Sequence, residues 1–250
     1  LNPRSLKTAE LVKKRDRIKT IFFDAADTLF YIRRGLGHTY AEVARKYGAD
    51  PDPSDIKKAF ARAFKSAPPL AFGNVSEEER RRLEKEWWKA IVESVYSEIG
   101  MFDEFDPHFD ELFEVFRGEA WTLFPETVQV LSSLKSGGYS LGIISNFDSR
   151  IYDVMRDLGI YEFFDLFVIS SEAGHAKPSH GIFSIALERA GRESHEVIHV
   201  GDNLCNDFHG ARALGIRALL LDREGEYAGV RVMDRLESLT AIERVLGRKR

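Results

Sequence analysis

Five polar residues of this 250-residue chain stand at or shortly after the ends of predicted strands. They are Asp24, Ser145, Lys177, Asp202 and Asp207. In an open parallel sheet the ligand site lies beyond the carboxyl ends of the strands, so side chains at those ends converge on one edge. Taken singly, each residue has an ordinary explanation as a turn residue, a helix cap or a solvated charge. Their combination at one edge indicates a reaction site.

The chemistry open to such a set is phosphoryl transfer. Three carboxylates without convergent histidines or thiols favour an oxygen-preferring cation such as Mg²⁺ over zinc. A cation would offset the repulsion between a carboxylate and an anionic phosphoryl group, so Asp24 could attack phosphorus and form an aspartyl-phosphate intermediate. Ser145 could donate to a phosphoryl oxygen, and Lys177 could neutralise its charge. The sequence therefore predicts that replacement of Lys177 by Ala cripples turnover.

The elements that must position these residues alternate in type. Runs rich in β-branched and aromatic residues predict buried strands, each separated from the next by a segment long enough for a helix. The predicted strands are residues 18–23, 139–144, 165–169, 197–200 and 217–221. This alternation predicts an α/β fold with a doubly wound, Rossmann-like parallel sheet covered by helices on both faces.

One helix of this core is marked at both ends. Pro125 suits a first helical turn, and Gly137 with Gly138 suits the helix end. The apolar residues between them predict the buried stripe. They are Val128, Leu131 and Leu134.

Residues 31–120 show helical periods and no convincing strand. The clearest helix begins at Ser76, which has capping-box spacing to Glu79. Apolar residues then recur at intervals of four and predict a core-facing stripe. They are Leu83, Trp87, Ile91, Val95 and Ile99. We therefore predict a four-helix cap domain at 31–120, inserted into a core made of residues 18–30 and 121–250.

Four short motifs contain the polar residues named above. They are Phe23 to Leu29, Ile143 to Asp148, Lys177-Pro178 with Ile182-Phe183, and Gly201-Asp202-Asn203 running on to Asp207. Their order and spacing resemble those of the haloacid dehalogenase-like (HAD) hydrolases, and the helical insertion is similar to the type 1 cap of that family. The second motif also resembles that of the eukaryotic haloacid dehalogenase-like hydrolase domain-containing subgroup.

The resemblance implies roles for the residues that match the motifs. Asp24 would be the nucleophile, and Ser145, Asn146 and Lys177 would bind the phosphoryl group. The implied activity is that of a magnesium-dependent phosphatase acting on a small phosphorylated metabolite.

The resemblance also implies a metal site. Asp24, the backbone carbonyl of Ala26 and Asp202 would ligate Mg²⁺. Asp207 would act on the metal directly or through water.

One residue departs from the family pattern. Phosphatases of this family usually carry a second aspartate two residues after the nucleophile, where this chain has Ala26. That aspartate protonates the leaving group, and such catalysis is worth about 10²–10⁴-fold. Asp27 is either a substitute acid or a turn residue, since Asp tolerates positive φ. The proton could also come from a cap residue such as His38, Arg33 or Arg34. An acyl phosphate substrate would need no proton donor at position 26.

Ala26 leaves two other classes of function open. Family members that cleave carbon–halogen or carbon–phosphorus bonds dispense with that aspartate. Against dehalogenation stand Asp202 and Asp207, because a displacement at carbon by Asp24 needs no metal and therefore no such pair of carboxylates. Phosphonate cleavage would need a Schiff-base lysine in the cap, where Lys57, Lys58 and Lys65 are compositional candidates. A weakly active or non-catalytic HAD-fold binding protein is the remaining alternative.

Two further residues lie among the motifs. His199 alternates with apolar neighbours and is interpreted as a satisfied histidine at the sheet. Cys205 is interpreted as a packing residue.

Composition and charge exclude other classes of protein. Lys plus Arg number 36 against 40 Asp plus Glu, a formal net charge of −4, so we expect no nucleic-acid partner. Charges interrupt every apolar run before the roughly 20 residues that a membrane helix needs. The basic start of the chain lacks a secretory apolar core, and Cys205 is the only cysteine, so we expect a cytoplasmic protein. The oligomeric state is not predicted.

Overall fold

The computed structural model describes residues 18–230 and 234–247, so the basic segment at residues 1–17 lies outside the described residues. A six-stranded sheet has the order β5-β4-β1-β6-β7-β8, and all its strand pairs are parallel. The strands are β1 (Thr20–Phe23), β4 (Ser140–Ser145), β5 (Leu166–Ile169), β6 (Val197–Gly201), β7 (Arg217–Leu221) and β8 (Arg235–Leu236). The five predicted strands are confirmed, and β8 was not predicted because two residues carry no periodicity.

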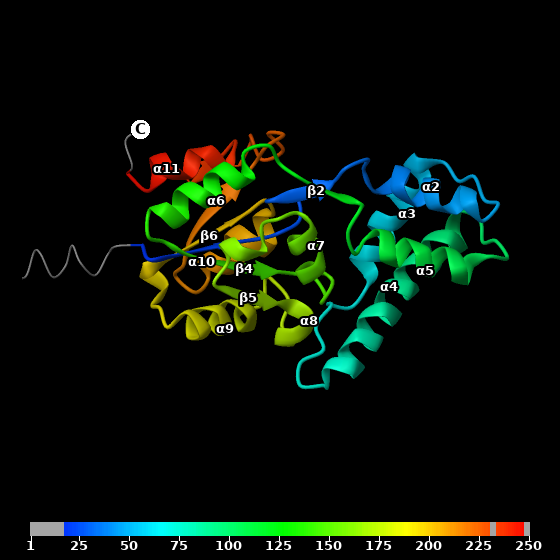
Figure 1. The fold of residues 1–250 in the computed structure, drawn as a ribbon, viewed down its shortest axis with the longest axis horizontal. Helices are drawn as coiled ribbons and strands as arrows, with labels where there is room; N and C mark the ends of the chain where they lie inside the picture. The colour runs from blue at the N-terminus through cyan, green and yellow to red at the C-terminus, as the bar shows by residue number, and fades with distance from the viewer. Residues whose placement is uncertain (1–17, 231–233, 248–250) are drawn as a thin grey trace, which may run out of the picture.

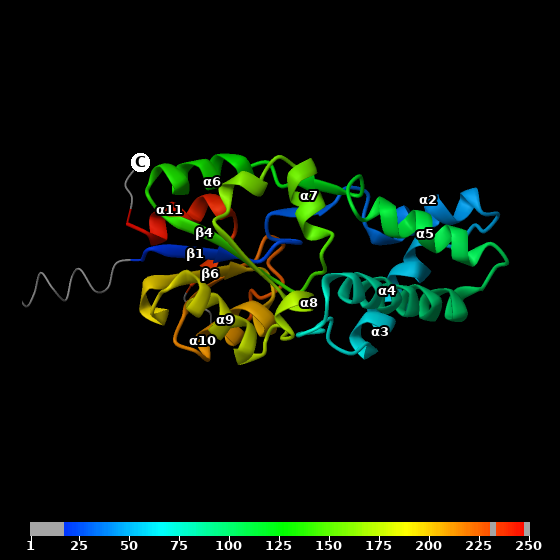
Figure 2. The same cartoon turned by 60° about the horizontal axis from the view of Figure 1, so that its bottom comes forward.

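Helices cover both faces of this sheet, as predicted (Figures 1 and 2). One face carries α6 (Thr127–Ser136), α7 (Ile151–Asp157) and α11 (Ile242–Val245), and the other carries α8 (Ser170–Ala173), α9 (His180–Ala190) and α10 (Gly210–Arg212). Short 3₁₀ helices are η1 (Tyr161–Phe163), η2 (Ser194–Glu196) and η4 (Leu239–Ala241), and η3 (Leu204–His209) is a π-helix. Strand β1 contributes to the apolar clusters on both faces of the sheet, because Ile21 and Phe23 pack in one cluster and Phe22 packs in the other.

Helix α6 corrects one detail of the predicted stripe. Val128 is 45% exposed, whereas Val130, Leu131 and Leu134 are buried. The helix begins at Thr127, whose hydroxyl donates to the carbonyl of Leu29 at 2.8 Å. That bond turns position 127 inward, so the stripe runs through 127, 130, 131 and 134, and Val128 faces solvent.

The predicted insertion contains four helices at the end of the molecule away from the sheet (Figure 1). They are α2 (Leu36–Lys46), α3 (Pro53–Ser66), α4 (Glu77–Ile99) and α5 (Phe105–Val115). Their apolar residues form a separate core cluster. We propose this insertion as a cap domain at 31–120. Val115 and Phe116 pack against both this cluster and the core.

Helix α4 begins as predicted. The hydroxyl of Ser76 accepts a hydrogen bond from the backbone N–H of Glu79 at 3.2 Å, whereas the Glu79 carboxylate accepts hydrogen bonds from Arg82. Within the predicted stripe, Ile91 and Val95 are buried. The stripe is less buried in the first half of α4, where Leu83 and Trp87 have intermediate exposure.

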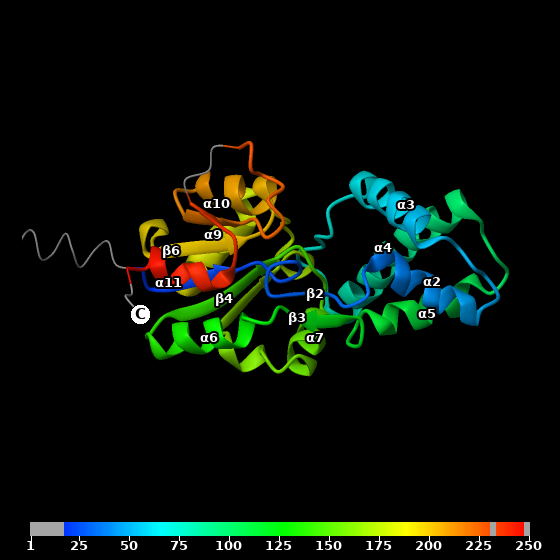
Figure 3. The same ribbon diagram turned by 90° about the horizontal axis from the view of Figure 1, so that it is seen from above.

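A short antiparallel pair, missed in the sequence, joins the insertion to the sheet. Strands β2 (Phe30–Ile32) and β3 (Trp121–Leu123) pair from Phe30 with Leu123 to Ile32 with Trp121. Figure 3 shows the pair at the junction between the sheet and helices α2–α5. The expectation of no strand after residue 30 was wrong, because three residues are too few to show alternation.

Among residues 18–230 and 234–247, no helix has both the length and the apolar character needed to cross a lipid bilayer.

His108 gives the cap a predicted sensitivity to acid. The side chain is fully buried among aromatic rings, and its Nε2 lies 3.2 Å from the Tyr96 hydroxyl. Burial lowers the pKa of His108 to about 4. Between pH 6.5 and 4 the unfolded chain binds a proton that the folded chain does not, so stability falls as the pH falls through this window. The predicted loss is up to about 3 kcal/mol.

Urea unfolding at pH 7 and pH 4.5 measures this loss. The double variant His108→Phe with Tyr96→Phe removes both hydrogen-bonding partners, so the acid-dependent loss should be smaller than in the wild type. His195→Gln, at an exposed position, is the control and should keep the wild-type loss. Equal pH dependence in all three proteins contradicts the prediction.

Candidate functional site

Three neighbouring strands deliver the predicted side chains to one edge of the sheet. Strand β1 lies between β4 and β6. Asp24 follows β1 and donates its backbone N–H to the carbonyl of Val200 at 2.8 Å. Ser145 is the buried last residue of β4, and Asp202 follows β6. The carboxyl ends of the central strands therefore meet at the predicted position.

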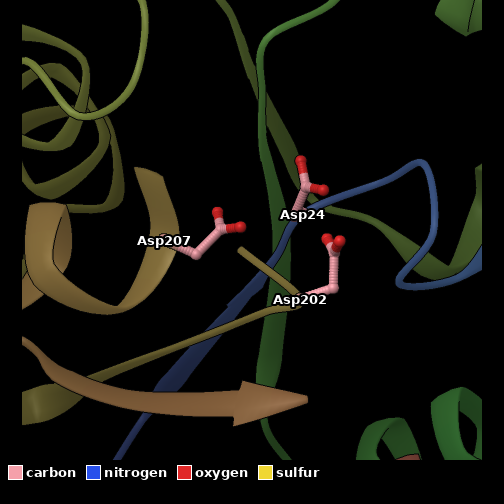
Figure 4. A group of neighbouring side chains, drawn as sticks. All are labelled: Asp24, Asp202 and Asp207. Atoms are coloured by element: carbon pink, nitrogen blue, oxygen red, sulfur yellow. The ribbon is translucent and has the colours of Figure 1, made fainter. Parts of the chain in front are cut away.

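Three carboxylates form a compact cluster there. Each of Asp24, Asp202 and Asp207 offers an oxygen atom, and these atoms lie within 4.8 Å of one another (Figure 4). Asp207 comes from the π-helix η3, in which the backbone N–H groups of Cys205 and Asn206 donate to the side chain of Asn203. A cluster built only from carboxylate oxygens fits Mg²⁺ by the chemistry of its donors.

Lys177 connects two of these carboxylates. Its Nζ lies 2.6 Å from Oδ1 of Asp24 and 2.6 Å from Oδ1 of Asp207, and its side chain is 3% exposed. Burial opposes the charge of Lys177, but Asp207 and Asp24 outweigh this effect and raise its pKa above the usual value. The alternative interpretation of Lys177 as a solvated surface charge is therefore wrong.

The carboxylates respond differently to this arrangement. For Asp207, Lys177 and His199 outweigh the effect of burial, and the pKa falls below its usual value. For Asp24, burial prevails over Lys177, and the pKa rises. Burial and the negative charges of Asp24 and Asp207 raise the pKa of Asp202 to about 8. The raised pKa values of Asp24 and Asp202 thus reflect burial and a repulsion among carboxylates that Lys177 alone does not offset, and a divalent cation would relieve this repulsion.

Asn146 holds the loop that contains Lys177. Its Nδ2 donates to the backbone carbonyl of Lys177 at 2.9 Å, and its Oδ1 accepts from the backbone N–H of Lys177 at 2.6 Å. Both ends of the amide are thus engaged by the Lys177 backbone. This contact aligns the loop between α8 and α9 with the end of β4.

Ala26 and Asp27, the second and third residues after Asp24, differ in structure and surroundings. Ala26 lines the space above the site without any group that can donate a proton. Asp27 has a φ of 59° and donates its N–H to the carbonyl of Phe30 at 2.7 Å. The backbone turn therefore uses Asp27 in the left-handed region, as in the structural alternative. Its side chain also lines the space above the site, where desolvation and the charge of Asp24 raise its pKa.

His199 has a contact that the sequence did not reveal. Its Nε2 lies 2.8 Å from Oδ1 of Asp207, and the ring is fully buried beside Phe183. The interpretation as a histidine satisfied within the sheet is confirmed for this nitrogen, with Asp207 as the partner. Alternation along β6 predicts the burial of His199. The partner lies on η3, which no pattern in the strand indicates.

A second polar cluster joins α4 to the loop after β4. Glu84 is 2% exposed, and its carboxylate accepts hydrogen bonds from the hydroxyl of Ser149 at 2.5 Å and from its backbone N–H at 3.1 Å. Trp88 donates from Nε1 to Oδ2 of Asp148 at 2.5 Å, and Asp148 also binds the guanidinium of Arg150 at 2.7 Å. Burial, opposed by Ser149, raises the pKa of Glu84. These contacts fix the cap over the motif that contains Ser145.

A cavity of about 920 Å³ lies between the cap helices and this edge of the sheet. Ala26, Asp27, Asn146 and Lys177 are among the core residues that line it, and most of the cap residues that line it are apolar. A substrate bound there would reach the site with its reacting group and contact the cap with its remainder.

Comparisons with known proteins agree with these motifs. The haloacid dehalogenase-like hydrolase family model matches residues 18–215. Haloacid dehalogenase-like hydrolase domain-containing protein 3 of Danio rerio is 32% identical over 212 residues, which cover 83% of this chain and 86% of the relative. The human protein of the same name is 31% identical over 210 residues, which cover 83% of each chain.

Solved structures share the fold. The putative HAD-hydrolase YfnB from Bacillus subtilis, bound to magnesium, has a TM-score of 0.70 at 18% identity and covers 93% of this chain and 100% of its own. A HAD phosphatase from Thermococcus onnurineus has a TM-score of 0.65 at 22% identity, covering 92% and 98%. The L-2-haloacid dehalogenase PA0810 has a TM-score of 0.69 at 19% identity, covering 92% and 99%. With its four motifs gathered at one sheet edge and its family match over most of its length, the chain belongs to the haloacid dehalogenase-like hydrolases.

Proposed function

We propose that this hydrolase is a Mg²⁺-dependent phosphatase that acts on a small phosphorylated substrate through an aspartyl-phosphate on Asp24. The observation that carries the proposal is the contact of Lys177 with both Asp24 and Asp207 beside Asp202. A buried cation and an excess of carboxylates are what an anionic phosphoryl group and a divalent metal require. Displacement at a carbon–halogen bond would use Asp24 but would leave Asp202 and Asp207 without a task.

The metal site follows from the same residues. Asp24, Asp202, Asp207 and the backbone carbonyl of Ala26 would hold Mg²⁺. When bound, the ion would offset the negative charge shared by these carboxylates and the phosphoryl group.

The proposed reaction has two steps. A carboxylate oxygen of Asp24 attacks phosphorus, the ester P–O bond breaks, and its electron pair leaves with the ester oxygen. Ser145 donates to a phosphoryl oxygen, and Lys177 holds the Asp24 carboxylate while its charge balances the transferring group. Water then attacks phosphorus, releases phosphate and restores the Asp24 carboxylate.

The first step lacks a proton donor at Ala26. Leaving groups that are stable as anions need no proton, whereas alkoxides do. The proposal therefore predicts that turnover depends steeply on the basicity of the leaving group. Hydrolysis of p-nitrophenyl phosphate and acetyl phosphate with and without Mg²⁺ tests the function, because neither leaving group needs much protonation. Failure to hydrolyse either compound contradicts the phosphatase proposal and favours a binding protein.

Ala26→Asp is expected to restore the missing proton donor. Hydrolysis of alkyl phosphates should rise by about 10²-fold, while hydrolysis of acetyl phosphate should change little. The measurement is kcat/KM for a series of phosphate esters against the pKa of the leaving group. Ala26→Asn has a similar shape without the proton and should give no such gain. An equal gain in both variants contradicts a role in proton transfer.

A further inference from the structure

The walls of the cavity above the site are built mainly from aromatic and aliphatic side chains of the cap. The cap residues lining it include Phe60, Phe64, Trp88, Val92, Phe109 and Phe113. Many of these rings contact one another, as Phe64 does with Phe60, Trp87 and Trp88 at centroid distances of 5.5, 5.9 and 6.2 Å. The cavity therefore presents a continuous apolar wall to whatever is attached to the phosphoryl group.

The indole N–H groups on these walls are already engaged. Three lining tryptophans donate their indole N–H groups within the protein. Trp87 donates to the carbonyl of Pro68 at 2.9 Å, Trp88 donates to Asp148, and Trp121 donates to the carbonyl of Phe116 at 3.0 Å. A hydroxylated ligand could not use these donors without breaking existing bonds.

The charged residues of the wall do not change this character. Arg150 is paired with Asp148 at 2.7 Å, donates to the carbonyl of Phe113 at 3.1 Å and lies 3.9 Å from the centre of the Phe113 ring. Lys65 and His175 also line the cavity, and both are exposed to solvent. Arg150 and Lys177 are thus the buried cations among the described lining residues. Arg150 is bonded to the cap, and Lys177 belongs to the proposed phosphoryl site.

We infer that the substrate is a phosphorylated compound whose organic part is apolar and whose leaving oxygen is a weak base, namely an acyl or aryl phosphate. This inference rests on the proposed function. The first half follows from the aromatic and aliphatic side chains that make up most of the cap lining, because sugar or nucleotide hydroxyls buried against those side chains would lose their hydrogen-bonding partners. The second half follows independently from Ala26, which supplies no proton to an alkoxide. The cavity volume of about 920 Å³ accommodates an organic part well beyond a few carbons.

An acyl phosphate series tests the apolar half at a constant leaving group. Acetyl, butanoyl, hexanoyl and octanoyl phosphate release carboxylates of nearly equal basicity but differ in apolar length. We expect kcat/KM to rise about threefold with each added methylene until the cavity is filled. Phenyl and 1-naphthyl phosphate form the aryl arm, in which the naphthyl ester should be preferred. Glycerol 3-phosphate and glucose 6-phosphate should be poor substrates.

A charge in the wall should remove the preference for length. Phe64 is 46% exposed at the cavity, so Phe64→Asp tests the wall at a position that is not part of the closed core. The ratio of kcat/KM for octanoyl phosphate to that for acetyl phosphate should fall at least about tenfold. Val128→Asp, on α6 and similarly exposed at 45%, is the matched control and should keep the wild-type ratio. Thermal unfolding of both variants checks that they are folded.

The outcomes distinguish a failure of this inference from a failure of the proposed phosphatase function. A flat or falling dependence on chain length, with Mg²⁺-dependent acetyl phosphate hydrolysis intact, overturns the apolar substrate and leaves the phosphatase standing. Preference for the sugar phosphates has the same meaning. Loss of the length preference in Val128→Asp as well as in Phe64→Asp would show that the cavity wall is not its source. No hydrolysis of any compound overturns both proposals.

Discussion

Asp24→Asn is expected to abolish Mg²⁺-dependent hydrolysis of acetyl phosphate and p-nitrophenyl phosphate, with a loss in kcat on the order of 10⁴ or greater. The amide oxygen is a poor nucleophile, and the substitution also removes a negative charge from the proposed metal site. Release of inorganic phosphate at saturating Mg²⁺ measures the loss. Rapid acid quenching followed by peptide mass spectrometry should detect a phosphorylated Asp24 in the wild type and not in the variant.

Asp165→Asn is the control for this experiment. Asp165 directly precedes β5, at the opposite edge of the sheet, where its carboxylate accepts hydrogen bonds from Lys135 and Ser140. Its replacement should leave hydrolysis near the wild-type rate. Substantial turnover in Asp24→Asn would contradict the assignment of the nucleophile. A wild type without turnover that binds a ligand equally well before and after the substitution would favour a binding protein.

Lys177→Met is expected to reduce both turnover and stability. Removal of one partner from a buried ion pair leaves its carboxylates uncompensated, which costs about 3–5 kcal/mol of unfolding free energy. The folded-state pKa values of Asp24 and Asp207 should rise in the variant, so the folded protein binds more protons than the unfolded chain. The stability deficit should therefore shrink as the pH falls from 7 to 5. Urea unfolding at both pH values measures it.

Lys135→Met supplies the comparison with an exposed ion pair. Lys135 lies 2.7 Å from Asp165, and both side chains are at least one-third exposed. Such pairs contribute about 0–1 kcal/mol, so this variant should unfold close to the wild type at both pH values. If Lys177→Met also unfolds like the wild type and retains turnover, Lys177 neither balances the carboxylates nor serves the reaction.

The sequence predicts the sheet and the site at its edge because both depend on local patterns. A buried parallel strand is a run of apolar residues, and the residue after the run lies at the carboxyl edge. Asp24, Ser145 and Asp202 could thus be placed together from strand ends alone. Strands β2, β3 and β8 could not, because two or three residues carry no period.

Contacts between separate elements could not be predicted from the sequence. Glu84 stands in a charged helical segment, and no spacing distinguishes it from its exposed neighbours. Its burial depends on where α4 meets the Ser149 loop. His199 and Asp207 likewise come from different elements. The apolar cavity depends on the cap helices and on core loops together, so its walls could not be assembled from any one stretch.

The β2–β3 pair also bears on how such a chain can diversify. Because Ile32 pairs with Trp121, the insertion leaves and re-enters the core at adjacent backbone positions. In the topology of the core, the whole cap therefore takes the place of a turn between the paired strands β2 and β3. A descendant could lengthen, shorten or replace that turn without shifting the register of β1, β4 or β6. Under the proposed function, such changes would alter the residues that contact the substrate while keeping the sheet edge that carries Asp24 in place.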